Sequence, residues 1–142
     1  MGWVRAVHLL SDFLLQRIRS SSVSYAMRKI LVVDDNVDGA VSFQLFLELL
    51  GHSAVVAHTG LEAIECVKRE MPEFVFLDIG LPGMNGYEVA RYIREMPNGK
   101  TPRIIAVTGW GSEQDKIKSG ESGCDGHLTK PIDLQEVEKL LG

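Results

Sequence analysis

Three aspartates and one lysine, each at the end of a short apolar run, are the residues of this sequence most suited to chemistry. Asp34 and Asp35 follow one short apolar run directly, Asp78 closes another, and Lys130 comes just after a third. If these positions meet, three carboxylates repel one another and one of them would take up a proton. A hard divalent cation removes that conflict, because it prefers oxygen ligands. The pattern therefore predicts a magnesium site beside a basic group, with Mn²⁺ as the alternative ion.

The same residues could hold a phosphoryl group. The ion and Lys130 would neutralise its oxygens, and Thr108, which ends a further apolar run, would donate a hydrogen bond. Asp78 would attack in line as the nucleophile. The chemistry predicted from these residue types is the formation of an aspartyl phosphate.

Alternating strands and helices must position these side chains. We expect strands at 29–33, 53–58, 74–77, 103–107 and 126–129, and helices at 37–50, 60–70, 86–96, 112–122 and 133–141. Five strand–helix units predict an α/β fold: a doubly wound, flavodoxin-like parallel sheet of order 2-1-3-4-5 with helices on both faces. Sites in such sheets lie at the carboxyl ends of the strands, where the strand order reverses. The first and third strands, which carry all three aspartates, are neighbours there.

Composition narrows the class of partner. The chain has 142 residues and a formal net charge of -4, and its Lys and Arg residues form no cluster of the kind that phosphate backbones require. No apolar run reaches the length of a membrane span. We therefore expect a cytoplasmic protein with no nucleic-acid partner and no membrane insertion.

Residues 1–26 differ from the rest and are expected to form an N-terminal extension. Within residues 3–18, apolar side chains recur at helical spacing, namely Trp3, Val7, Leu10, Leu14 and Ile18. Residues 20–24 have the composition of a flexible linker. The compact domain is expected to cover residues 27–142.

From about residue 28 onward, the chain resembles the receiver domains of response regulators in two-component signalling. The resemblance lies in four stretches: ILVVDDN at 30–36, LDIGLPGMNG at 77–86, VT at 107–108 and TKP at 129–131. It implies that Asp78 receives a phosphoryl group from a sensor histidine kinase or a histidine phosphotransfer protein. Such a domain is not an enzyme, but a phosphoacceptor that assists its own phosphorylation and dephosphorylation.

The resemblance also assigns roles to single residues. The metal ligands that it implies are Asp34, Asp35, Asp78 and the backbone carbonyl of Gly80. Thr108 and Lys130 would bind the phosphoryl group, and the Lys130–Pro131 peptide bond would be cis, which X–Pro linkages tolerate best.

Two further pairs of residues are expected to set how the signal is read and how long it lasts. Thr108 and His127 would form the switch, with His127 at the position where the family usually has Tyr or Phe. The alternative is that His127 is a solvated histidine on an edge strand. In many receivers, the residues two beyond the acceptor and two beyond the threonine orient or exclude the hydrolytic water, so the resemblance implies that Gly80 and Trp110 tune the lifetime of the phosphoryl group.

Two other functions fit the predicted sheet less well. An aspartyl-phosphate phosphatase needs a second acid two residues beyond the nucleophile, and Gly80 stands there. A flavin-binding module needs a phosphate cradle after the first strand, where Asp34 and Asp35 would repel phosphate. The stretches at 85–90 and 108–111 resemble receivers at the C-terminus of hybrid sensor kinases. We thus expect either a stand-alone receiver or a piece of such a kinase.

The remaining expectations concern surfaces. His52 and His58 are expected at the surface or at an edge. The helix at 37–50 carries more apolar residues than one buried face needs, the additional ones being Val41, Leu45, Phe46 and Leu49. Such an excess predicts a partner surface, with a kinase or phosphotransfer helix, a second copy of the chain in a dimer, or residues 3–18 as the candidates.

Overall fold

The computed structural model describes residues 27–97, 102–109 and 113–142, with no side-chain detail at 113–115. The expected helix within residues 3–18 and Trp110 lie outside the described residues. The elements alternate along the chain in the order β1 (Lys29–Val33), α2 (Val37–Leu49), β2 (Ser53–Ala57), α3 (Gly60–Glu70), β3 (Phe74–Asp78), α4 (Gly86–Glu95), β4 (Arg103–Thr108), α5 (Glu113–Glu121), β5 (Gly126–Thr129) and α6 (Leu134–Leu141).

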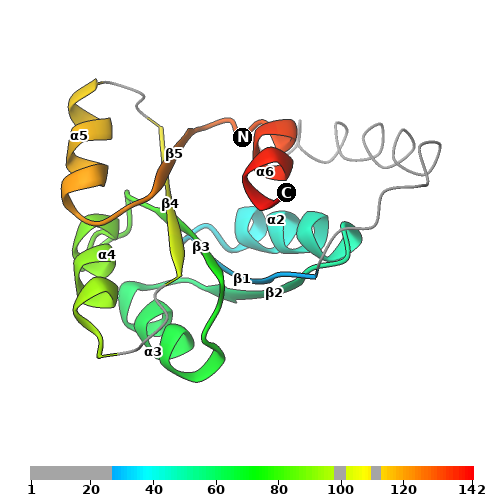
Figure 1. Ribbon diagram of the computed structural model, residues 1–142, viewed down its shortest axis with the longest axis horizontal. Coiled ribbons are helices and arrows are strands. Elements are labelled where there is room, and N and C mark those ends of the chain that lie inside the picture. Colours follow the sequence, from blue (N-terminus) through cyan, green and yellow to red (C-terminus); the bar gives the residue numbers. More distant parts are fainter. Residues whose placement is uncertain (1–26, 98–101, 110–112) are drawn as a thin grey trace.

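The strands form one parallel sheet of order β2-β1-β3-β4-β5, as predicted. Figure 1 shows α2 and α6 on one face of the sheet, α3 and α4 on the other, and α5 next to the edge strand β5. The strand order reverses between β1 and β3: β2 lies on the outer side of β1, whereas β3 and the later strands lie on its other side. This position is the switch point of the sheet. A site between these two strand ends is therefore open to solvent.

The central strands β1 and β3 are mostly apolar because helices cover both of their faces. On β1, Ile30 and Val32 pack toward α2 and α6, whereas Leu31 and Val33 pack toward α3 and α4. The side chains of β3 alternate in the same way. Burial on both faces is what removes the polar–apolar alternation from parallel strands.

Side-chain caps fix where the helices begin. The Asn36 side chain accepts a hydrogen bond from the Gly39 amide at the start of α2, and Asn85 accepts one from the Glu88 amide at the start of α4. A cap of this kind satisfies one of the free amides of the first helical turn. Asn36 directly follows Asp34 and Asp35, and Asn85 closes the loop after Asp78, so both caps anchor the chain beyond the carboxyl ends of β1 and β3.

Two expectations about surface residues were wrong. His52 is buried, because its Nδ1 accepts a hydrogen bond from the Arg28 backbone amide at 3.0 Å. Phe46 belongs to the core, where it packs near Phe43 between α2 and the sheet. The other three additional apolar residues of α2, Val41, Leu45 and Leu49, are exposed.

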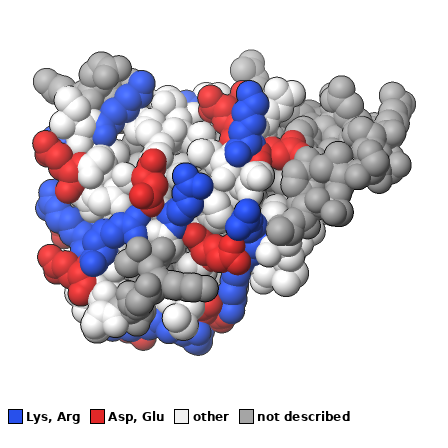
Figure 2. Space-filling view, in the orientation of Figure 1, with Lys and Arg blue, Asp and Glu red and all other residues white. Residues whose placement is uncertain are grey.

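The surface carries charges of both signs. On the face shown in Figure 2, the Lys and Arg side chains of the described residues are interspersed with Asp and Glu. Within the described part of the chain, no helix is long and apolar enough to cross a membrane.

Candidate functional site

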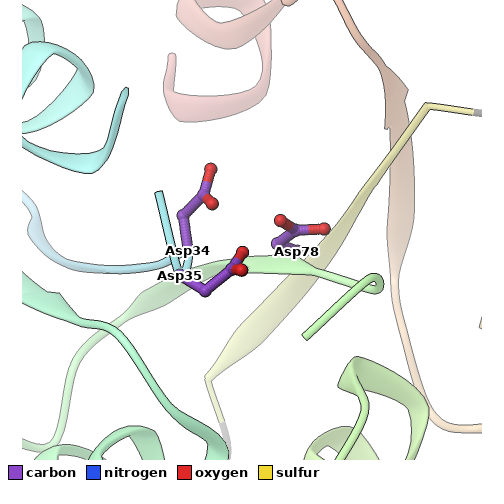
Figure 3. Close-up of side chains that lie close together, drawn as sticks. All are labelled: Asp34, Asp35 and Asp78. Carbon is purple, nitrogen blue, oxygen red and sulfur yellow. The ribbon is translucent and has the colours of Figure 1, made fainter. Parts of the chain in front are cut away.

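Three carboxylates meet at the carboxyl ends of β1 and β3. Val33 pairs with Leu77 in the parallel register, so the residues that come next, Asp34 and Asp78, lie side by side. Each of Asp34, Asp35 and Asp78 offers an oxygen atom, and these three atoms lie within 4.8 Å of one another. Figure 3 shows the three side chains converging above the two strand ends.

Backbone amides hold two of these carboxylates in place. The Asn36 amide donates to Asp34 Oδ1 at 2.9 Å, and the Gly80 amide donates to Asp78 Oδ1 at 2.8 Å. Asp34 and Asp78 are buried, whereas Asp35 is exposed. Because a buried carboxylate needs hydrogen-bond partners, these amides fix the positions of the two side chains.

Lys130 brings the positive charge that the sequence predicted. Its Nζ lies 3.2 Å from Asp78 Oδ2 and 3.5 Å from Asp34 Oδ2. The Lys130 backbone amide donates to the Thr108 carbonyl at 2.7 Å, which fixes the residue next to the end of β4. The Lys130–Pro131 peptide bond is cis.

The burial of Asp34 makes the cluster electrostatically strained. Loss of solvation raises the pKa of Asp34 from 3.8 to about 6, against the lowering effects of the Asn36 amide and Lys130. Burial lowers the pKa of Lys130, but the carboxylates of Asp78 and Asp34 outweigh it and leave that pKa raised. The site therefore holds more negative charge than its own lysine balances.

Thr108 and Gly80 stand on either side of Asp78. Thr108 is buried at the end of β4, and Val107, the residue before it, pairs with Asp78. Gly80 is exposed, and a Cβ built there would lie 3.5 Å from Asp78 Oδ1. A side chain at position 80 would thus contact the Asp78 carboxylate.

Gly86 lets the loop after β3 close tightly. A Cβ at this position would lie 2.6 Å from the Asp78 carbonyl oxygen and 2.7 Å from Ile79 Cα, which no ordinary packing allows. The Gly86 amide also donates to the Ile79 carbonyl at 3.2 Å. Glycine therefore lets α4 start directly against the strand end that carries Asp78.

His127 lies on the edge strand and is half-buried rather than fully solvated. It pairs with Ala106 of β4. Both ring nitrogens are shielded from solvent and have no hydrogen-bond partner among the described residues. A shielded imidazole without partners is costly, which sets His127 apart from an ordinary surface histidine.

His58 contributes to the site and was missed. It is half-buried, and its Nδ1 lies 3.0 Å from the Asp34 backbone oxygen. The strand order could have found it, because Val33 pairs with Ala57 and the next residues, Asp34 and His58, must then be neighbours. The imidazole thus helps to hold the loop that carries Asp34 and Asp35.

The residues present suit a Mg²⁺ ion. The donors are carboxylate oxygens, which hard cations prefer, and they lie close enough together to share one ion. The cluster also sets three carboxylates beside one lysine, so its negative charges outnumber its positive one. A divalent cation would supply the missing positive charge.

A doubly wound sheet with an acidic cluster and a lysine at its switch point is the architecture of receiver proteins in two-component signalling. The chain belongs to the response regulator receiver domain family, whose model matches residues 30–141. It is thus a receiver domain of the two-component response-regulator class.

Similar proteins support this family at the level of sequence. The chain is 36% identical over 116 residues to an uncharacterized 14.6 kDa protein in the sodA1 3' region of Leptolyngbya boryana, covering 82% of this chain and 88% of that protein. It is 30% identical to Protein PilH of Pseudomonas aeruginosa, covering 81% of this chain and 95% of PilH.

Solved structures agree in fold. The chemotaxis protein CheY4 of Vibrio cholerae matches with a TM-score of 0.76 and 25% identity, over 82% of this chain and all of CheY4. A second match is the co-crystal structure of the Saccharomyces cerevisiae histidine phosphotransfer protein Ypd1 and the receiver domain of Ssk1. The TM-score is 0.77 and the identity is 29%, over 84% of this chain and 89% of the matched chain.

Proposed function

We propose that Asp78 accepts a phosphoryl group from a phosphohistidine on a sensor kinase or a phosphotransfer protein. The observation that carries this proposal is the position of the Asp78 carboxylate. It lies at the switch point of the sheet, between a donating amide at 2.8 Å and the Lys130 ammonium at 3.2 Å. An anionic oxygen held among positive groups is oriented for attack on phosphorus.

The transfer exchanges one bond for another. An Asp78 oxygen forms a bond to phosphorus as the bond from phosphorus to the donor's imidazole nitrogen breaks, and the imidazole leaves as a neutral ring after taking up a proton. Lys130 stays close to the charge that develops on the phosphoryl oxygens. Thr108, buried on the adjacent strand end, offers its hydroxyl to one of these oxygens.

Asp34, Asp35, Asp78 and the Gly80 carbonyl would hold the Mg²⁺ ion. When bound, the ion supplies positive charge that offsets the phosphoryl oxygens and the crowded carboxylates. The Asn36 amide and His58 keep Asp34 and its loop in position for this role.

A similar protein was solved with a partner of the kind proposed here. The yeast Ssk1 receiver was solved with Ypd1, a histidine phosphotransfer protein. We infer that this chain meets a donor of the same kind, a protein that presents a phosphohistidine at the acidic edge. The rival reading as a phosphatase is disfavoured, because Gly80 supplies no acid for a leaving group.

Labelling with a small donor tests the acceptor. Acetyl phosphate or phosphoramidate with Mg²⁺ should add one phosphoryl group to the full chain, and hydroxylamine should remove it, as it removes acyl phosphates. Asp78→Asn should abolish labelling, because an amide oxygen is a poor nucleophile, and EDTA should suppress it in the unaltered chain. Intact mass spectrometry measures both.

Asp38→Asn is the matched control. Asp38 is an exposed carboxylate in the first turn of α2 and is not part of the three-carboxylate cluster. The control should label as the unaltered chain does. Labelling of Asp78→Asn at the normal rate would place the acceptor elsewhere.

A further inference from the structure

A line of apolar side chains runs along the outer face of α2. Val37, Val41, Leu45 and Leu49 follow one another every four residues, so each lies one turn beyond the last. Each is between 49 and 54% exposed, although the opposite face of the same helix is buried in the core. We call these four residues the α2 stripe. Contiguous exposed apolar surface of this kind marks a contact surface.

Negative charges accompany the stripe. Asp38 and Glu48 lie on the same outer face, one near each end of α2, and both are exposed. The helix itself contains no Lys or Arg, and the salt bridges among described residues include neither carboxylate. A complementary partner would be an amphipathic segment with a basic side chain beside its apolar face.

The chain's own residues 3–18 have that composition. Their apolar positions recur every three or four residues, which is the spacing of one helix face, and comprise Trp3, Val7, Leu10, Leu14 and Ile18. Arg17, near the end of this segment, lies beside that face on a helix, whereas Arg5 lies on the opposite side. This segment precedes the part of the chain that the family model covers, so the common receiver fold does not require it.

The point where the chain enters the domain lies at one end of the stripe. The Arg28 amide donates to His52 Nδ1 at 3.0 Å, and the Arg28 carbonyl accepts from the Ser53 amide at 2.9 Å. His52 and Ser53 come just after α2, so residue 28 lies near the Leu49 end of the stripe. Residues 19–26, the tether between the segment 3–18 and the domain, therefore join the domain beside the α2 stripe.

The tether is long enough for the segment to cover the stripe. Residues 19–26 can span up to about 26 Å when extended, while the stripe, from Val37 to Leu49, is about 18 Å long at the rise of an α-helix. A short tether gives an effective concentration in roughly the millimolar range. The tethered segment therefore has an advantage over a second copy of the chain at ordinary protein concentrations.

We propose that residues 3–18 form an amphipathic helix that docks on the α2 stripe of the same molecule. Ile18 lies toward Leu49 and Trp3 toward Val37, so that Arg17, which flanks the apolar face, lies near Glu48. The docked segment ends beside the acidic edge, because α2 begins directly after its cap, Asn36. This docking does not rest on the proposed function.

Trp3 fluorescence in the full chain tests the docking. Trp110→Phe leaves Trp3 as the only tryptophan in all samples. Docked Trp3 should emit at shorter wavelength than in a free peptide of residues 1–26 and should resist quenching by acrylamide. Leu45→Asp, which places a charge in the middle of the stripe, should move the emission to longer wavelength and raise quenching several-fold.

Leu61→Asp is the control, because Leu61 is also an exposed leucine but belongs to α3, on the other side of the sheet. It should leave Trp3 unchanged. Trp3 emission equal to that of the free peptide, or an equal response to both variants, would overturn the proposal. If the protection of Trp3 from acrylamide disappears on dilution and sedimentation shows a dimer, the segment docks on a second copy of the chain, and the proposal of docking within one molecule is overturned.

A charge exchange tests the orientation. Glu48→Arg should increase Trp3 quenching, and adding Arg17→Glu in the same chain should restore protection. Failure to restore it would overturn the assigned direction. Since none of these measurements involves phosphorylation, their failure cannot be confused with failure of Asp78 as the acceptor.

Discussion

Asp34 is the residue whose charge state links the site to the stability of the fold. Its folded pKa of about 6 lies above the ordinary value of 3.8, chiefly because it is buried. The folded state therefore binds more protons than the unfolded state between these values. The stabilising contribution is fully present below pH 3.8 and is lost as the pH rises through 6. A shift of this size corresponds to roughly 3 kcal/mol.

Without divalent ions, the free energy of unfolding of the unaltered chain should thus fall relative to that of Asp34→Asn as the pH rises from 4.5 to 7. Urea unfolding in EDTA at both pH values measures the difference. At pH 7, Mg²⁺ should stabilise the unaltered chain more than the Asn variant, because the ion restores the missing positive charge. Parallel pH profiles for the two proteins would mean that Asp34 does not carry this charge strain.

Gly80 is a second residue with a local consequence. It leaves open the space over Asp78 Oδ1 into which a side chain would project, so it provides no group to orient a hydrolytic water. With Trp110 as the second lifetime residue, we expect slow self-dephosphorylation. Gly80→Asn combined with Trp110→Glu should shorten the lifetime of the phosphoryl group, as followed by decay of the phosphorylated mass after donor removal. An unchanged or longer lifetime would contradict this role.

At the scale of elements, β5 is the segment expected to report phosphorylation. His127 has two shielded ring nitrogens without described partners, next to β4, which ends in Thr108. Movement of Thr108 toward a phosphoryl oxygen would vacate space that the His127 imidazole can enter. His127→Ala should therefore leave Asp78 phosphorylation nearly normal but weaken the response of β5 and α6. Comparison of NMR shifts at residues 127–141 with and without beryllofluoride measures that response, and equal responses would make His127 a bystander.

The elements and the acidic cluster were predictable because their signals are local. Apolar runs, caps such as Asn36, and an aspartate directly after a strand require only neighbouring residues to be recognised, and strand order then brings Asp34 and Asp78 together. His52 was misjudged because its partner, the Arg28 amide, is distant in sequence. The same holds for Arg94, which donates to the carbonyls of Gly123 and Pro102 and to Asp125. Such tertiary contacts leave no periodic trace in the sequence.

At the scale of the whole molecule, the fold should not depend on residues 1–26. The two core clusters on either side of the sheet draw on side chains from Ile30 onward, and the family model begins at the same residue. A chain that starts at Met27 should therefore unfold cooperatively, with a midpoint lowered by less than about 4 °C, the shift expected for the loss of roughly 1 kcal/mol in a domain of this size. It should still label at Asp78, and its exposed α2 stripe should favour self-association.

Removal of residues 133–142 is the contrasting deletion. It takes away α6, whose Leu134, Val137 and Leu141 are buried in the core, and loss of several buried aliphatic side chains exceeds the stability of a typical domain. Circular dichroism and thermal melts of both truncated chains should show a folded protein in the first case and an unfolded one in the second. Loss of cooperative unfolding in the chain that starts at Met27 would show that the extension is part of the core, rather than a segment that docks on a finished domain.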